Sequence, residues 1–256
     1  MMRLTRIPAR INIWIRRARS RLRLMRLRLN QLIGREISNS PRLQLPLLTL
    51  GSRTAAWTFT PKGIHSGSIV YSLGVGTDIT FDLAFIEVFG AEVFAFDPTP
   101  KSTAWISHQI LPPRFHFFAW GVAAKDGSAT FALTTRPDWT SYQMGGDVTK
   151  AHDVVELPVR RLPSIMSELR HDHLDLLKMD IEGAEFEVIQ DLASCGLRVD
   201  QLLVEFHYHR GDRLAMERVR ATIRVLESMG LLLFARSSGG HEFSFARTQA
   251  RPTQRA

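Results

Sequence analysis

An apolar run that ends in two acidic residues and then changes to helical spacing constrains the fold of this chain most strongly. Residues 174–179 predict a short buried strand, Asp180 and Glu182 follow it, and residues 184–189 have the spacing of a helix. Ligands of open α/β sheets bind beyond the carboxyl ends of the strands. We therefore expect Asp180 and Glu182 at a reactive site, whereas Glu185 suits the positive end of the following helix dipole.

The rest of the chain alternates strand-like and helix-like segments. Strands are predicted at 68–73, 92–96, 115–120, 174–179, 200–206, 231–235 and 243–246, with helices at 79–89, 101–110, 162–170 and 212–229. This alternation predicts an α/β fold with a mostly parallel, doubly wound sheet. The link 236–241 is too short for a parallel crossover, so one of the last two strands must run antiparallel.

The segment between the third strand and residue 160 is expected to leave the main sheet. Residues 125–128 predict a turn into a hairpin-like excursion that continues to residue 133. Residues 135–151 have little periodicity and predict a loop over the pocket, and residues 154–159 return as a strand.

Charge is distributed unevenly along the chain, and the difference separates an N-terminal extension from the rest. The net charge is +8, yet residues 1–35 hold eleven arginines and no acidic residue, and the remainder holds 22 basic and 25 acidic residues. We predict a basic amphipathic N-terminal extension at 1–35, a connector at 36–66 with one short element near 57–59, a catalytic domain at 67–247 and a frayed tail at 248–256.

The arginine-rich extension is compatible with several partners. Its arginines interrupt every apolar run, which excludes a secretory signal and a transmembrane span. A helix on an anionic membrane surface, an organellar transit peptide, a nucleic-acid-binding arm and a helix docked on the domain remain open. The single cysteine excludes an internal disulfide framework and suits a reducing compartment. We expect a cytoplasmic protein, peripheral at a membrane if the first alternative holds, with organellar targeting still open.

A glycine turn and a second acid suggest the class of cofactor. Gly74 and Gly76 end the first strand, and Asp97 ends the second, 23 residues beyond Gly74. Asp78, which is also the predicted N-cap of the next helix, and Ile79 depart from a dinucleotide fingerprint, and Asp78 would repel a pyrophosphate. S-adenosylmethionine, which carries a sulfonium and an ammonium group but no phosphate, fits better, and its ribose would suit Asp97. The alternative is a purely structural glycine turn.

Four segments carry a family resemblance. Residues 70–76, 96–100, 125–127 and above all 177–185 (LKMDIEGAE) resemble the FkbM-type S-adenosylmethionine-dependent methyltransferases, and the match runs in order from about 68 to 209. The resemblance implies a Rossmann-like class I methyltransferase fold with a seven-stranded sheet and helices on both faces. It also implies O-methylation of a hydroxyl on a sugar, glycan or other natural-product acceptor.

Carried over to this sequence, the resemblance assigns the cofactor site. Gly74 and Gly76 would line the cofactor, Asp97 would hold its ribose, and Asp180 with Glu182 would lie at the methyl-transfer face. Many members have Asp where this chain has Ser72, and a third Gly where it has Asp78. Asp78 is therefore our candidate for the group that binds the methionine ammonium.

Methylation of a hydroxyl requires removal of its proton. Asp180, Glu205 and His207 lie at neighbouring predicted strand ends, so any of them is a candidate base, and His207 has the unperturbed pKa best suited to the role. The same three side chains are the ligands of an alternative, less favoured divalent cation site.

Three rival functions are weighed against the O-methyltransferase. A nicotinamide dehydrogenase is disfavoured by the glycine turn. A nucleic-acid methyltransferase would use the arginine-rich arm, but the strand end at 179–182 lacks the prolines expected for base methylation. A membrane-surface binding module would keep the fold without turnover. The oligomeric state does not follow from the sequence.

Overall fold

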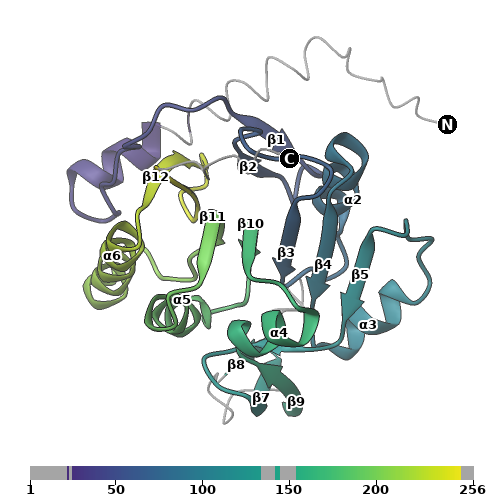
Figure 1. The fold of residues 1–256 in the computed structure, drawn as a ribbon. Helices are drawn as coiled ribbons and strands as arrows, with labels where there is room; N and C mark the ends of the chain where they lie inside the picture. The colour runs from purple at the N-terminus through teal and green to yellow at the C-terminus, as the bar shows by residue number, and fades with distance from the viewer. Residues whose placement is uncertain (1–21, 23–24, 134–141, 145–153, 249–256) are drawn as a thin grey trace, which may run out of the picture.

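A seven-stranded sheet forms the centre of the protein (Figure 1). The structure, a computed structural model, describes residues 22, 25–133, 142–144 and 154–248. In sheet order the strands are β12 (Leu231–Arg236), β13 (Glu242–Arg247), β11 (Arg198–Glu205), β10 (His173–Met179), β3 (Ile69–Leu73), β4 (Glu92–Phe96) and β5 (Phe115–Phe118).

The direction of the strands confirms the predicted sheet. β13 pairs antiparallel with both β11 and β12, and the pairs from β11 across to β5 are all parallel. The short link between β12 and β13 leaves no room for a crossover helix, which is why the single reversal occurs there. The carboxyl ends of β3, β4, β10 and β11 therefore lie along one edge of the sheet.

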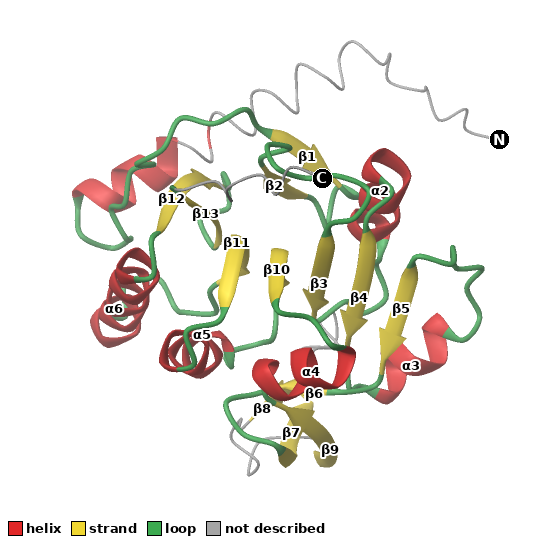
Figure 2. Cartoon of the chain, in the orientation of Figure 1, coloured by secondary structure: helices red, strands yellow, loops and turns green. Residues whose placement is uncertain are grey.

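Helices cover both faces of this sheet, also as predicted (Figure 2). Side chains alternate along each strand, so neighbouring residues enter different cores: Leu176 packs with the first core and Leu177 with the second. The first core is covered by α2 (Thr80–Phe89) and α3 (Pro100–Ile106), and the second by α4 (Leu162–Leu169), α5 (Glu185–Ser194) and α6 (Arg213–Ser228).

The predicted connector packs against the sheet. β1 (Leu48–Leu50) pairs antiparallel with β2 (Trp57–Phe59), which confirms the short element expected at 57–59. Trp57 and Phe59 are buried in the core under α2, and the backbone N–H of Thr60 donates to Gln201 at 3.1 Å. The boundary at residue 67 stays a prediction, with buried side chains on both sides of it.

A second, four-stranded sheet replaces the predicted hairpin. Its order is β6 (Gly121–Val122), β9 (Val154–Arg160), β7 (Gly127–Leu133) and β8 (Tyr142–Met144). The hairpin prediction is wrong because β9 lies between β6 and β7. Asp126 in the turn accepts hydrogen bonds from Arg161 N at 2.8 Å and Ser164 Oγ at 2.7 Å, which ties the turn to the start of α4. Apart from β8, the predicted loop over the pocket lies outside the described residues.

The N-cap of α2 and the C-terminal end of α3 differ from the predictions. α2 begins at Thr80 with Ile79 as its N-cap, so Asp78 is not the cap; its carboxylate instead accepts hydrogen bonds from Thr80 N at 3.1 Å and Thr80 Oγ1 at 2.6 Å. α3 ends at Ile106 and not at Ile110. Within the described residues, every helix is too short or too polar to cross a bilayer.

Candidate functional site

The glycine turn after β3 is held against the end of β10. Gly74 has φ 73°, and a Cβ added there would lie 1.7 Å from the carbonyl oxygen of Asp180. Gly74 is therefore required by the close approach of two strand ends, a different reason from the ligand approach expected from the sequence. Gly76 has φ 55° with no atom within 4 Å of an added Cβ, so it leaves open space for a ligand.

Asp97 braces this turn from the end of β4. Its carboxylate accepts hydrogen bonds from Gly76 N at 2.9 Å, Thr99 N at 2.9 Å and Thr99 Oγ1 at 2.6 Å. The side chain is buried, and these bonds fix its orientation. Because two carboxylate oxygens offer about four acceptor sites, capacity remains for a ribose hydroxyl.

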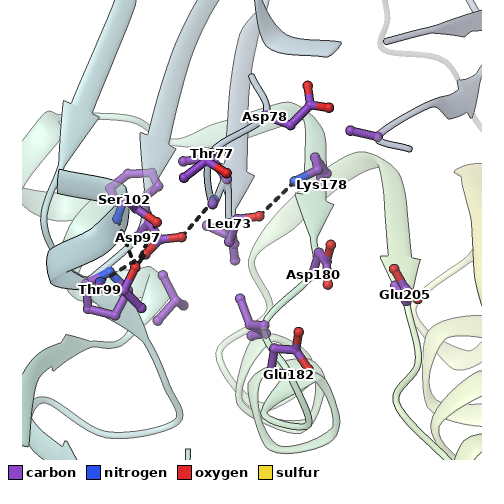
Figure 3. Close-up of a pocket in the computed structure, with 18 of the residues that line it drawn as sticks. Leu73, Thr77, Asp78, Asp97, Thr99, Ser102, Lys178, Asp180, Glu182 and Glu205 are labelled. Atoms are coloured by element: carbon purple, nitrogen blue, oxygen red, sulfur yellow. Dashed lines mark hydrogen bonds between the residues drawn. The ribbon is translucent and has the colours of Figure 1, made fainter. Parts of the chain in front are cut away.

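A pocket of about 360 Å³ opens between the glycine turn and the ends of β10 and β11. Figure 3 shows Asp97 on one side of the pocket and Asp180, Glu182 and Glu205 on the other. The candidate residues that line the pocket are Gly74, Gly76, Asp78, Asp97, Asp180, Glu182 and Glu205. The fold thus brings seven of the eight predicted site residues to one cavity, within the size range of small-molecule sites.

His207, the eighth candidate, lies outside the pocket lining and contacts the acidic residues of the pocket. Its Nε2 lies 3.6 Å from Asp180 Oδ1 and 3.4 Å from Glu182 Oε2, and its Nδ1 donates to the fully buried Glu185. Burial alone would lower the pKa of His207, but the hydrogen bond to Glu185 and the surrounding carboxylates raise it to about 10. His207 is therefore a cation at neutral pH, which argues against a role as the base.

Glu205 has the ionisation that a base at neutral pH requires. Burial, helped by the negative charge of Asp180, raises the pKa of Glu205 to about 7 despite the opposing charge of His207. Burial also raises the pKa of Asp180, with Lys178 and His207 opposing the shift. Because catalysis by a base is most efficient when its pKa is near the working pH, Glu205 is the strongest candidate base.

Glu182 is held in an unusual backbone conformation. Its φ is 52°, in the left-handed region that side chains other than glycine rarely adopt. Gly183, with φ 104°, follows it and completes the sharp connection from β10 into α5. Such strain is tolerated where the surroundings fix the backbone, and here it points the Glu182 side chain into the pocket.

Lys178 is a pocket residue to which the sequence analysis gave no role. Its Nζ donates to the carbonyl oxygen of Gly74 at 3.1 Å and lies 5.4 Å from the centre of the Trp57 ring. The Lys178 side chain is buried, and its positive charge opposes the rise in the pKa of Asp180 that burial causes. The sequence did carry a signal, because a lone lysine in an apolar strand needs a specific partner.

Asp78 provides a carboxylate to the pocket directly after the Gly74–Gly76 turn. Burial would raise its pKa, but hydrogen bonds from Thr80, Ser52 and Thr54 outweigh this effect and lower it. Ser52 Oγ donates to Asp78 Oδ2 at 2.7 Å. The carboxylate is therefore ionised at neutral pH and suits an ammonium group. Ser72, by contrast, is fully buried and lies outside the pocket lining.

The three predicted ligands of the alternative cation site lie close together. One ligand atom from each of Asp180, Glu205 and His207 lies within 4.8 Å of the others. His207 would have to lose a proton to bind a metal ion, against the stabilising contact with Glu185. We therefore keep the divalent cation as the less favoured alternative.

Comparison with known proteins identifies the family. The sequence model of the methyltransferase FkbM domain matches residues 72–233, which is more than half of the chain. The chain belongs to the FkbM methyltransferase family. The family resemblance stated from the sequence is thereby confirmed, and the sheet described above is that of a Rossmann-like class I methyltransferase.

Curated relatives match part of this chain. Methyltransferase-like protein 24 from Homo sapiens is 30% identical over 142 residues, which cover 55% of this chain and 32% of the relative. The corresponding protein from Rattus norvegicus is 28% identical over 142 residues, covering 55% and 33%. The matched region thus spans about a third of the length of these relatives.

Solved structures give weaker similarities. Aeropyrum pernix fibrillarin in complex with S-adenosyl-L-methionine has a TM-score of 0.40 at 11% identity, covering 71% of this chain and 66% of that chain. Human N-acetylserotonin methyltransferase in complex with the same molecule has a TM-score of 0.37 at 12% identity, covering 72% and 48%. The family assignment rests on the domain match and not on these scores.

The residues of the pocket fit S-adenosylmethionine, the cofactor of this family. The open space beside Gly76 admits a ligand against the turn, and Asp97 has acceptor capacity for a ribose diol. The ionised Asp78 complements an ammonium group, and the acids at the end of β10 complement a sulfonium. When bound, S-adenosylmethionine supplies an electrophilic methyl group.

Proposed function

We propose that this FkbM methyltransferase transfers a methyl group to a hydroxyl of a sugar, glycan or other natural-product acceptor. The proposal rests on one observation: the carboxylate of Glu205 lines the pocket and its pKa is raised to about 7. An alcohol is a poor nucleophile until its proton is removed, and a carboxylate with this pKa accepts protons at neutral pH.

The neighbouring acids support a polyhydroxyl acceptor. Asp180 and Glu182 line the pocket beside Glu205 and accept hydrogen bonds, so they suit the further hydroxyl groups of a sugar. His207 lies within 3.6 Å of both carboxylates and, as a cation, orients them and offsets their repulsion. His207 is in this proposal a positioning residue.

Methyl transfer in this pocket requires one methyl transfer and one proton transfer. The oxygen of the acceptor forms a bond to the methyl carbon as the carbon–sulfur bond breaks, and the bonding pair remains on sulfur. Glu205 takes the hydroxyl proton, so the products are a methyl ether and S-adenosylhomocysteine. The pocket contributes by holding the two reactants in line, which is worth several orders of magnitude in rate.

A methyl-transfer assay with matched variants tests the proposal. The full chain is incubated with methyl-labelled S-adenosylmethionine and a panel of glycans, natural-product alcohols and amines, and products are identified by mass. We expect methyl ethers, and Glu205→Gln should lower kcat by roughly 100- to 10,000-fold. Glu87→Gln, a control on the exposed side of α2, should leave kcat unchanged. Products from amines alone, or a Glu205→Gln variant with full activity, would refute O-methylation through Glu205.

A further inference from the structure

An apolar stripe is exposed on the helix that precedes the domain. Residue 22 and residues 25–32 are helical. The exposed fractions along the stripe are 64% for Leu22, 67% for Met25, 57% for Leu29, 84% for Leu32 and, just after the helix, 54% for Ile33. The spacing of four and three residues places Met25, Leu29 and Leu32 on one face of the helix.

The opposite face of the helix is docked on the domain. Leu27 is buried, and its Cδ1 lies 2.7 Å from the position of a Cβ added at Gly240 in the β12–β13 turn. Gln31 Nε2 donates to the carbonyl oxygen of Ile37 at 2.9 Å. The domain therefore covers one side of the helix, and the apolar stripe faces away from it.

The junction between helix and domain is firmly anchored. Ile37 is fully buried in the core, and the buried Glu36 accepts a hydrogen bond from Tyr208 and pairs with Arg236 Nη2 at 3.0 Å and Arg210 Nε at 2.6 Å. A buried carboxylate with two guanidinium partners is costly to break. The stripe is thus held in a fixed orientation relative to the methyltransferase domain.

Exposed arginines border the stripe on both edges. At 100° per residue, Arg26 and Arg28 lie about 80° to either side of the centre of the stripe. Within the part of the chain that the structure describes, neither arginine forms an ion pair with an acid. The sequence of residues 1–35 adds to this charge, with eleven arginines and no acidic residue in total.

We propose that the apolar stripe and its flanking arginines bind the surface of an anionic bilayer, with the helix parallel to the membrane plane. Apolar side chains with cationic borders are the features of interfacial helices, whose arginines reach the phosphate layer while the apolar side chains enter the acyl boundary. A second copy of the chain fits less well, because a symmetric contact would place the bordering arginines of both copies together. A nucleic acid would contact the arginines and leave the apolar stripe in water.

Vesicle co-sedimentation of the full chain tests this proposal. Vesicles of phosphatidylcholine with 30% phosphatidylserine are compared with pure phosphatidylcholine, at low and high salt. The triple variant Met25→Gln, Leu29→Gln, Leu32→Gln replaces the three stripe side chains within residues 25–32. Its matched control is Ile110→Gln, Leu214→Gln, which removes two side chains that are 100% and 85% exposed elsewhere. Equal melting temperatures verify that each variant is folded.

The expected pattern is specific to a membrane helix. Wild type and control should bind anionic vesicles, and the triple variant should bind at least tenfold more weakly. Arg26→Gln with Arg28→Gln should weaken binding roughly 30-fold, at about fivefold per cation. Equal binding of the triple variant, or equal affinity for neutral and anionic vesicles, would overturn the proposal. Loss of a dimer in the triple variant, without vesicle binding by wild type, would assign the stripe to a second copy.

Discussion

Replacing Glu205 with Gln should increase the stability of the protein although it slows methyl transfer strongly. The pKa of Glu205 rises from an ordinary value of 4.5 to about 7 because burial and the charge of Asp180 disfavour the ionised form. An acid with a raised pKa binds more protons in the folded state than in the unfolded state. Folding stability therefore falls as pH rises from 4.5 through 7, and a neutral Gln removes this loss.

The size of the effect follows from the shift. Each unit of pKa corresponds to about 1.4 kcal/mol, so the shift of Glu205 sets an upper limit of about 3.5 kcal/mol. Asp180 and His207 adjust their ionisation when Glu205 becomes neutral, which reduces the gain, and we expect about 1–2 kcal/mol at pH 8. For a domain of this size the melting temperature should rise by roughly 2–4 °C per kcal/mol.

Urea and thermal unfolding at pH 5 and pH 8 measure this difference directly. At pH 5 the native Glu205 is largely protonated, but the unfolded side chain is already mostly ionised, so the stability gain of Glu205→Gln should be at most about 0.8 kcal/mol. At pH 8 the gain should be clearly larger. Glu87→Gln serves as the control, since that side chain is exposed on α2. A variant that is less stable than wild type at pH 8, or equally shifted at both pH values, would refute the buried, charge-coupled environment assigned to Glu205.

Three further predictions concern the other parts of the pocket. Asp180→Asn should lower kcat at least 100-fold with no loss of melting temperature, and unchanged turnover would remove Asp180 from the site. Asp97→Ala should weaken S-adenosylhomocysteine binding at least tenfold in isothermal titration, and normal affinity would disprove its ribose contact. Gly74→Ala should destabilise the fold by more than about 3 kcal/mol, because the added Cβ meets the Asp180 carbonyl at 1.7 Å, whereas Gly76→Ala should cost only about 1–2 kcal/mol and chiefly impair cofactor binding. Similar urea midpoints for the two alanine variants would contradict this contrast.

The positions and directions of the main strands were predictable because each strand is a separate apolar run bounded by polar turns. The second sheet was not, since β7 pairs with β9, which lies across a segment without periodicity. A local turn signal at 125–128 could not show that a later strand would occupy the place of the hairpin partner. Local pattern therefore identifies elements better than it identifies their neighbours.

The location of the site was predictable, but the ionisation of its residues was not. Strand ends identified the acids, because the carboxyl ends of parallel strands meet at one edge. The protonation of His207 depends on Glu185, which sequence reasoning assigned to the helix dipole. Glu185 does begin α5, yet its side chain is fully buried against His207. Glu185 and His207 are 22 residues apart in the sequence, so only the packing of the folded chain reveals their contact.

A crystal structure with S-adenosylhomocysteine and a magnesium salt tests the assignment of the pocket most directly. We predict the ribose at Asp97, the amino group near Asp78, and the sulfur facing the side of the pocket formed by Asp180 and Glu205. A cation between Asp180, Glu205 and His207 would establish the less favoured metal-assisted alternative. S-adenosylhomocysteine bound away from the Gly74–Gly76 turn, or with its sulfur facing away from Glu205, would contradict the proposed arrangement of cofactor and base.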